Sequence, residues 1–106
     1  MNSQHSKYLY LTTTGRLSGQ PREIEIWFAE HGEHYYLIAE HRDRTHWVRN
    51  IQVQPKVKVR VGDTQFDATS RVVRDHDEPE LSSAVKALFD AKYGWSDGLI
   101  VEVTRV

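Results

Sequence analysis

No cysteine occurs among the 106 residues of the chain, which excludes disulfides, thiolate metal ligands and a cysteine nucleophile. Charge of one sign is not in excess either, because 14 basic and 15 acidic residues leave a formal net charge of −1. Such a balance gives no long-range attraction to nucleic acid or to an anionic membrane. No apolar run approaches the ~20 residues that span a bilayer, and the polar residues 1–7 lack the apolar stretch of a secretory signal. We therefore expect a cytoplasmic protein that binds no nucleic acid and does not span a membrane.

The length of the chain suits one domain. A domain of this size buries roughly two-thirds of the surface that its unfolded chain exposes, so little material is left to enclose a large site. A cofactor would therefore lie in a surface groove or at a subunit interface. We expect a flexible N-terminal segment over residues 1–7 and a single domain over residues 8–106.

Alternation of apolar and polar residues predicts six strands. They are expected over residues 8–13, 22–29, 34–40, 56–61, 64–75 and 99–106. Helical periodicity predicts a short helix over residues 44–53, with Asp43 as its N-cap, and a longer helix from about residues 77–79 to Lys92. This order favours a mainly β (α+β) fold, an antiparallel barrel with one short and one longer helix covering its ends. Periodicity alone does not show whether the sheet closes.

The candidate catalytic motifs of many enzymes are missing. The sequence shows no nucleophile–base pair and no carboxylate dyad. His31, His34, His41 and His46 lack the i, i+4 spacing with a neighbouring glutamate that is typical of a zinc site, so we expect no metal. This pattern suits an enzyme whose cofactor carries the chemistry while the protein supplies position and electrostatics.

The turn between the first two expected strands is a candidate phosphate site. Its two glycines allow backbone N–H groups to face outward, and Arg16 and Arg22 flank Ser18 and Gly19 in a way that suits bidentate binding of phosphate. The alternative interpretation is an ordinary hairpin loop whose arginines are solvated.

A second basic segment follows the third expected strand. Arg42 and Arg44 stand where the short helix begins, so they could meet the same phosphate or an acidic tail. The alternative is a solvated loop in which Asp43 only caps the helix. Trp47 and Asn50 share one face of that helix, where Trp47 either closes the barrel end or contacts a planar ligand.

Four elements in fixed order carry a family resemblance. Residues 12–22 read Thr-Thr-Thr-Gly-Arg-Leu-Ser-Gly-Gln-Pro-Arg, followed by the pair Trp27-Phe28, the helix motif Trp-Val-Arg-Asn-Ile over 47–51, and Gln-Pro at 54–55 before a valine-alternating strand. From about Tyr8 to Val103 the chain resembles the deazaflavin (F420)-dependent nitroreductase-like family of the flavin/deazaflavin oxidoreductases. These proteins share the pyridoxamine 5'-phosphate oxidase-like, FMN-binding split barrel.

The resemblance implies a six-stranded antiparallel split β-barrel and an oxidoreductase. Its cofactor would be coenzyme F420, a deazaflavin with a phosphate and a polyglutamate tail, or alternatively FMN. The reduced coenzyme would transfer hydride to a small organic acceptor such as a quinone, an enone or a nitroaromatic. The alternative is a non-catalytic split-barrel module that binds FMN or another flavin- or tetrapyrrole-like ligand. Many split barrels place their cofactor between two subunits, so a homodimer is also expected.

The resemblance also implies site residues. The expected cofactor-binding residues are Arg16, Ser18, Gly19, Gln20, Pro21, Arg22, Ile38, Ala39, Arg42, Arg44, Trp47 and Asn50. The expected substrate pocket consists of Trp27, Tyr93 and Trp95, and the proton donor would be Tyr93 or bound water. The alternative for Tyr93 and Trp95 is an ordinary packed turn. One position departs from the family, since many members carry lysine where this chain has Leu17. That loss of a cation leaves both the binding of the tail and the retention of activity open.

Overall fold

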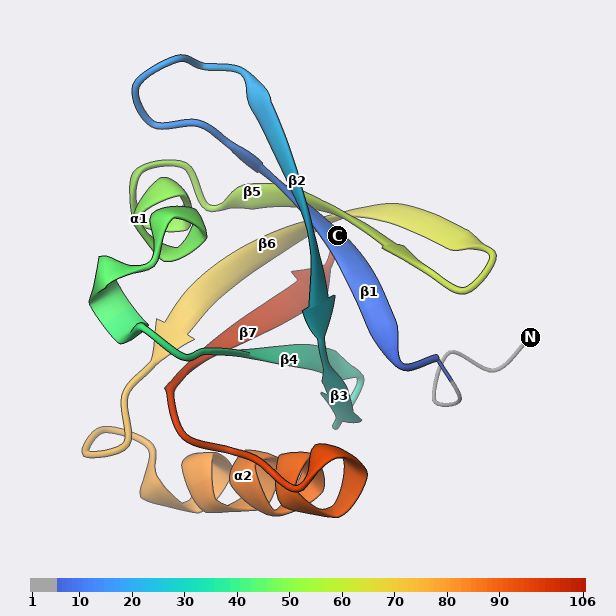
Figure 1. Ribbon diagram of the computed structural model, residues 1–106, viewed down its shortest axis with the longest axis vertical. Helices are drawn as coiled ribbons and strands as arrows, with labels where there is room; N and C mark the ends of the chain where they lie inside the picture. Colours follow the sequence, from blue (N-terminus) through green and yellow to red (C-terminus); the bar gives the residue numbers. More distant parts are fainter. Residues whose placement is uncertain (1–5) are drawn as a thin grey trace.

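The computed structural model describes residues 6–106, and Figure 1 shows its elements. The expected N-terminal segment 1–7 therefore lies mostly outside the described residues. The strands are β1 Tyr8–Thr14, β2 Pro21–Trp27, β3 Ala29–His31, β4 His34–Ala39, β5 Lys56–Val61, β6 Thr64–Val73 and β7 Leu99–Arg105. The helices are the 3-10 turn η2 Arg42–Arg44, the short helix α1 His46–Val53 and the longer helix α2 Pro79–Tyr93. Within this part of the chain, no helix is long and apolar enough to cross a membrane.

The strands form one curled antiparallel sheet in the order β2-β1-β5-β6-β7-β4-β3. Strands β2 and β3 are its two edges. They follow each other in the chain, but β2 pairs with β1 and β3 pairs with β4. The sheet therefore curls toward closure without a ladder between its edges, as Figure 1 shows. This arrangement confirms the mainly β, split-barrel fold with two helices.

The sheet has seven strands rather than six, because the expected strand 22–29 divides at Phe28. Phe28 is fully buried, and its backbone groups bond to side chains instead of a neighbouring strand. Its N–H donates to the Tyr93 hydroxyl at 3.0 Å, and its carbonyl accepts from Lys92 Nζ at 3.0 Å. Because both groups are satisfied by α2, the chain can change pairing partner without leaving a buried polar group unbonded.

The concave face of the sheet holds the main core. Strand β5 illustrates it, because Val57, Val59 and Val61 point inward while the residues between them are exposed. Val48 and Ile51 of α1 pack into the same core, so α1 fills one end of the half-barrel. Helix α2 packs on the outer face, where a second buried cluster joins it to β4, β6 and β7.

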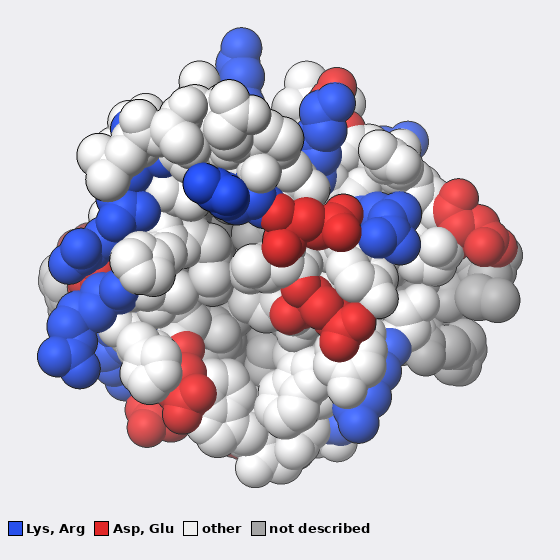
Figure 2. Space-filling view, turned by 45° about the horizontal axis from the view of Figure 1, so that its top comes forward, with Lys and Arg blue, Asp and Glu red and all other residues white. Residues whose placement is uncertain are grey.

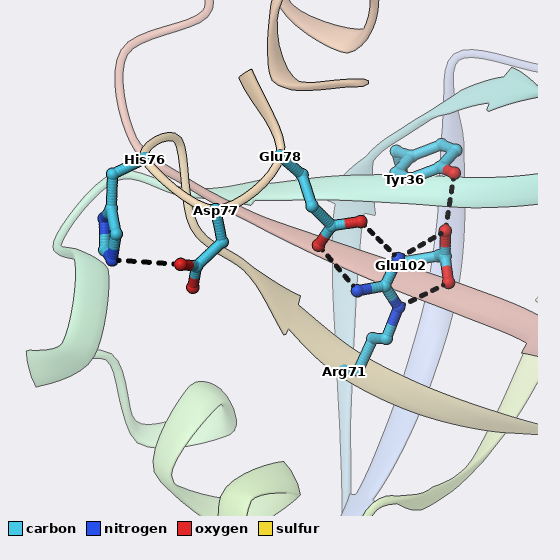
Figure 3. A network of polar contacts seen from close by, with 6 residues as sticks. All are labelled: Tyr36, Arg71, His76, Asp77, Glu78 and Glu102. Carbon is cyan, nitrogen blue, oxygen red and sulfur yellow. Dashed lines mark hydrogen bonds and ion pairs between the residues drawn. The ribbon is translucent and has the colours of Figure 1, made fainter. Parts of the chain in front are cut away.

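A polar network ties the start of α2 to the outer face (Figure 3). Arg71 of β6 donates to Glu78 at 2.7 Å and to Glu102 of β7 at 2.8 Å, and Glu102 also accepts from the Tyr36 hydroxyl at 2.7 Å. Burial acts to raise the pKa of Glu102, but the bonds from Arg71 and Tyr36 outweigh it and hold that pKa below its ordinary value. The network thus keeps both carboxylates ionised and fixes α2 against the sheet.

The start of the short helix differs from the expectation. Thr45, not Asp43, is the N-cap of α1, because η2 precedes it and uses the segment 42–44. The carboxylate of Asp43 instead bonds to the two terminal nitrogens of Arg74 at 2.8 and 2.9 Å. A charged partner from β6's C-terminal side therefore outcompetes the local capping interaction that the sequence suggested.

Candidate functional site

A groove of about 770 Å³ lies between the β1–β2 loop and the start of α1. We call it the cationic groove, because arginines and histidines are the only ionisable residues in its lining within the described range 6–106. Its lining consists of Thr13, Gly15, Arg16, Leu17, Ser18, Arg22, Ile24, His41, Arg44, Thr45, His46, Trp47 and Asn50. The loop, the inner face of β2 and the segment after β4 thus contribute its walls.

The β1–β2 loop is closed by its own backbone. The Gly15 N–H donates to the Gln20 carbonyl at 2.8 Å, and the Gly19 N–H donates to the Gly15 carbonyl at 2.8 Å. A Cβ atom at Gly15 would stand 2.7 Å from Ser18 Oγ and 3.2 Å from the Gln20 carbonyl oxygen, so a larger residue there would displace the Ser18 side chain. Ser18 Oγ also accepts from the Gln20 N–H at 3.1 Å. The loop therefore has a defined shape that sets Arg16 and Arg22 on its two arms.

Helix α1 fixes the side chain of Arg16. Asn50 Oδ1 accepts from Arg16 Nη1 at 2.9 Å and from the Arg16 backbone N–H at 3.2 Å. Asn50 Nδ2 in turn donates to Thr13 Oγ1 at 3.1 Å, and Asn50 is only 4 % exposed. One buried amide therefore holds the end of β1, the loop and the helix in register.

The N-terminus of α1 lies at the edge of the groove, because Thr45, His46 and Trp47 line it. Thr45 lines the groove as N-cap, yet its Oγ1 makes no capping bond and is buried without a hydrogen-bond partner. Helix N-termini carry partial positive charge, and Arg22 and Arg44 add two guanidiniums to the same lining. No carboxylate lines this groove among residues 6–106. The combination favours binding of a phosphate or of a carboxylate chain.

A second cavity of about 380 Å³ adjoins the cationic groove, and we call it the aromatic pocket. It is lined by Tyr8, Glu25, Ile26, Trp27, Ile38, Glu40 and Trp95. The two cavities are neighbours because the same segments build both. Along β2, Ile24 lines the groove and Ile26 the pocket, while after β4 Glu40 lines the pocket and His41 the groove.

The linings of the two cavities carry charges of opposite sign. Arg16, Arg22 and Arg44 line the groove, and Glu25 and Glu40 line the pocket. On one face of the molecule, Figure 2 shows blue side chains along the left margin and two groups of red side chains near the centre, the upper of which has blue neighbours.

The expected site residues divide into three groups. Arg16, Ser18, Arg22, Arg44, Trp47 and Asn50 line the cationic groove. Trp27, Ile38 and Trp95 line the aromatic pocket. The third group, which lines neither cavity, is Gly19, Gln20, Pro21, Ala39, Arg42 and Tyr93.

The third group has other positions. Gly19 and Pro21 line a different cavity, which also takes in residues of β5 and β6. Ala39 is buried in the core, and Arg42 forms an ion pair with Asp97 at 3.0 Å. Tyr93 lies beneath Trp27, with the two rings stacked at 4.4 Å and nearly parallel.

The Tyr93 hydroxyl is fully engaged with the backbone. It accepts from the Phe28 N–H, and it lies 2.7 Å from the Lys7 carbonyl and 2.9 Å from the Phe28 carbonyl. These bonds give the hydroxyl a structural role, and Tyr93 does not line the aromatic pocket. The Trp27 ring is covered by the stacked ring of Tyr93 and by the edge of Trp95.

Sequence reasoning missed several lining residues, among them Thr13, Ile24 and Thr45. The alternation of residues 22–29 predicts that Ile24 points inward. It does not predict that this strand lies at the edge of the sheet, where an inward residue can line an open groove. Thr45 had the signal of an N-cap, a threonine directly before the apolar helix pattern, but Asp43 offered the same signal.

Comparison with known proteins identifies related sequences. Residues 2–98 match the family described as F420H(2)-dependent quinone reductase. An F420H(2)-dependent quinone reductase of Mycobacterium tuberculosis is 32% identical over 72 residues, which cover 65% of this chain and 48% of the relative. The chain thus spans about half the length of the curated relatives that it matches.

Solved structures share the fold. HutZ, a heme storage protein from Vibrio cholerae, superposes with a TM-score of 0.80 at 21% identity, covering 98% of this chain and 84% of HutZ. An F420-H2 dependent reductase, FDR-A, superposes with a TM-score of 0.70 at 23% identity, covering 92% of each chain. At these identities the similarity establishes the half-barrel fold and does not extend to ligands.

Proposed function

The chain belongs to the F420H(2)-dependent quinone reductase family, and on that premise we propose that it binds coenzyme F420 in the cationic groove and uses it to reduce a quinone-type acceptor. Membership agrees with the resemblance carried by residues 12–22 and 47–51. The cofactor, the acceptor and the roles of single residues are proposals for this chain, because it spans about half of its curated relatives.

One observation carries the proposal, namely the composition of the groove. Three arginines and the N-terminus of α1 surround it, and no carboxylate among the described residues lines it. The coenzyme has a phosphate and a polyglutamate tail, so it presents several negative charges along one chain. Thr45, whose buried Oγ1 has no hydrogen-bond partner, belongs to the same lining. The residues present therefore fit the group.

The residues divide the work of binding. Arg22 and Arg44 bind the anionic part, and Arg16 does so from a position that Asn50 fixes. Trp47 offers a flat face in the groove. Beyond it, Ile38 and Trp27 provide an apolar wall for the acceptor. When bound, reduced F420 supplies a hydride, and a quinone that takes this hydride and one proton from water becomes a hydroquinone.

The experiment that tests this function is an anaerobic assay of reduced F420 with menadione as acceptor. We expect oxidation of reduced F420 in proportion to enzyme, and no enzyme-dependent increase over the direct reaction when reduced FMN replaces it. The absence of turnover, together with tight binding of FMN or of haem, would instead support a non-catalytic carrier on the same fold.

We also propose a homodimer and a cytoplasmic location. The support for the dimer is that β2 and β3 end the sheet, and edge strands provide surfaces through which copies associate. Light scattering of the purified protein would give twice the chain mass of 12.4 kDa for a dimer. A mass of one chain would contradict it.

A further inference from the structure

We infer that Glu25 and Glu40 make the aromatic pocket select against anionic acceptors, so that the physiological acceptor is a neutral or cationic planar compound. This inference rests on the proposed function, because it concerns the acceptor side of the same reaction. It goes beyond that function by naming a charge class of acceptor and the two residues that set it.

The pocket has a rigid apolar wall. Trp27 is stacked on Tyr93 at 4.4 Å and meets Trp95 edge to face at 6.1 Å. Ile26 and Ile38 complete this wall. A wall of two indoles and two isoleucines suits a flat, largely apolar ring system.

The only charged residues in the described lining of the pocket are Glu25 and Glu40. Glu25 accepts a hydrogen bond from the Tyr10 hydroxyl at 2.7 Å, which is a neutral donor and leaves the carboxylate charged. The hydrogen bond to Glu25 is the main cause that raises the pKa of Tyr10 above its ordinary value, and the negative charge of Glu25 is the second cause. Arg60 lies over the Tyr10 ring, with Cζ 4.0 Å from the ring centroid, and pairs with Glu23 at 3.6 Å, but it does not line the pocket.

Glu40 is exposed directly after β4. Its carboxylate forms no ion pair with any of the described residues 6–106. The next cation along the chain, Arg42, is bound to Asp97 at 3.0 Å. Lys7 Nζ lies 5.7 Å from the centre of the Tyr8 ring, and Lys7 does not line the pocket. Glu25 and Glu40 therefore both belong to the lining of the pocket, which contains no arginine or lysine among the described residues.

The neighbouring cavities thus have opposite preferences. An anionic quinone is repelled by the pocket and attracted to the cationic groove, where Arg16, Arg22 and Arg44 lie. It should therefore act as a poor acceptor and as a competitor of F420. A cationic quinone should do neither.

The test compares kcat/KM for three naphthoquinones: neutral menadione, a sulfonated derivative and a trimethylammonium derivative. The variants are Glu40→Gln and Glu25→Gln, with Glu80→Gln in the exposed first turn of α2 as the matched control. For Glu40→Gln we expect kcat/KM to rise about threefold to tenfold with the sulfonate and to fall with the cation, as one charge at several ångströms in a solvated pocket would produce. Menadione should change little, and added salt should weaken both effects.

Opposite changes for the two charged acceptors are the decisive readout, because a structural defect lowers all three rates together. The inference would be overturned if Glu40→Gln retains activity and changes kcat/KM, relative to the wild type, by the same factor for all three acceptors. The proposed function would then remain intact. No turnover by the wild-type protein with any of the three acceptors would overturn both. If Glu25→Gln loses stability with its bond to Tyr10, Glu40→Gln still decides the question.

Discussion

Asn50 Oδ1 accepts two hydrogen bonds from Arg16, one from the guanidinium at 2.9 Å and one from the backbone N–H at 3.2 Å. Because the amide nitrogen of Asn50 also bonds to Thr13, a single residue of α1 controls both the shape of the β1–β2 loop and the aim of an arginine. The cationic groove therefore keeps its shape only while Asn50 is bonded to Arg16 and Thr13.

Replacement of Asn50 by alanine should lower both stability and affinity for F420. The change leaves the Thr13 hydroxyl and the Arg16 N–H without their partner in a buried place, which costs about 1–3 kcal/mol of unfolding free energy. Urea unfolding and a titration with F420 would measure the two effects. Gln52→Ala on the exposed side of the same helix is the control. Normal affinity in Asn50→Ala would show that Arg16 needs no support.

Leu17 offers a gain-of-function prediction. Its side chain lines the cationic groove and is 92% exposed. Many members of the family that the sequence resembles carry lysine at this position. Leu17→Lys should tighten binding of F420 by about twofold to fivefold at low salt, the size of an exposed charge pair, and less at high salt. Leu17→Gln removes the same apolar side chain without adding charge. Equal affinities for the two variants would exclude Leu17 from the path of the tail.

Tyr93→Phe separates a structural role from proton donation. The variant keeps the ring stacked on Trp27 but leaves the Phe28 N–H unbonded, which should reduce stability by about 1–3 kcal/mol. We expect kcat to change by no more than roughly twofold, whereas loss of a general acid costs about 100-fold or more. Thermal unfolding and steady-state rates at one temperature, well below the transition, would measure both. A drop in kcat of that larger size would restore Tyr93 as proton donor.

The network around Arg71 predicts a loss of stability in acid. The bond from Arg71 lowers the pKa of Glu78, and bonds from Arg71 and Tyr36 overcome burial to lower the pKa of Glu102. A group whose folded pKa is depressed contributes stability above its unfolded pKa, about 4.3 for glutamate, and loses it as the pH falls through the folded pKa. Unfolding free energy should therefore decline as the pH drops from about 5 toward 3.

Arg71→Met checks this assignment. Loss of the contact with Glu102 should cost about 1–2 kcal/mol at neutral pH, a figure discounted because the Arg71 side chain is half exposed. The decline of stability in acid should also become shallower. Lys86→Met, which removes the ion pair between Lys86 of α2 and Asp75 in the segment before that helix, serves as control and should have the smaller effect. An unchanged pH profile in Arg71→Met would contradict the role of the network.

The sequence predicted the strands and helices correctly where residues close together in the chain determine them. The alternation of Lys56–Val61 and the turn after it placed β5 and its partner β6, and Gly94 ends α2 in a left-handed conformation with φ of 71°. It failed at Phe28, because period-2 alternation continues unbroken while the pairing partner changes from β1 to β4. The satisfaction of the Phe28 backbone by Tyr93 and Lys92, more than 60 positions away, has no local signal.

The candidate site was predicted in the same uneven way. Arg16, Arg22 and Arg44 line one groove because the loop and the start of α1 meet there, as the sequence suggested. Arg42 was grouped with them by its position in the chain, but η2 turns it to Asp97. The separation into two cavities depends on the curl of the sheet, which brings β2 next to the end of β4. No pattern within either segment reports that approach.

The central claim is that the cationic groove binds the anionic part of F420, and equilibrium titration tests it most directly. Binding to the wild-type protein, to Arg22→Ala/Arg44→Ala and to the control Lys56→Ala/Lys58→Ala on the exposed face of β5 would be followed by tryptophan fluorescence. We predict that F420 binds the wild type and the control alike, that FMN binds more weakly, and that the groove variant loses tenfold or more in affinity, since each charge-assisted bond contributes about 1.5–3 kcal/mol. Equal affinity of F420 for all three proteins would contradict the account.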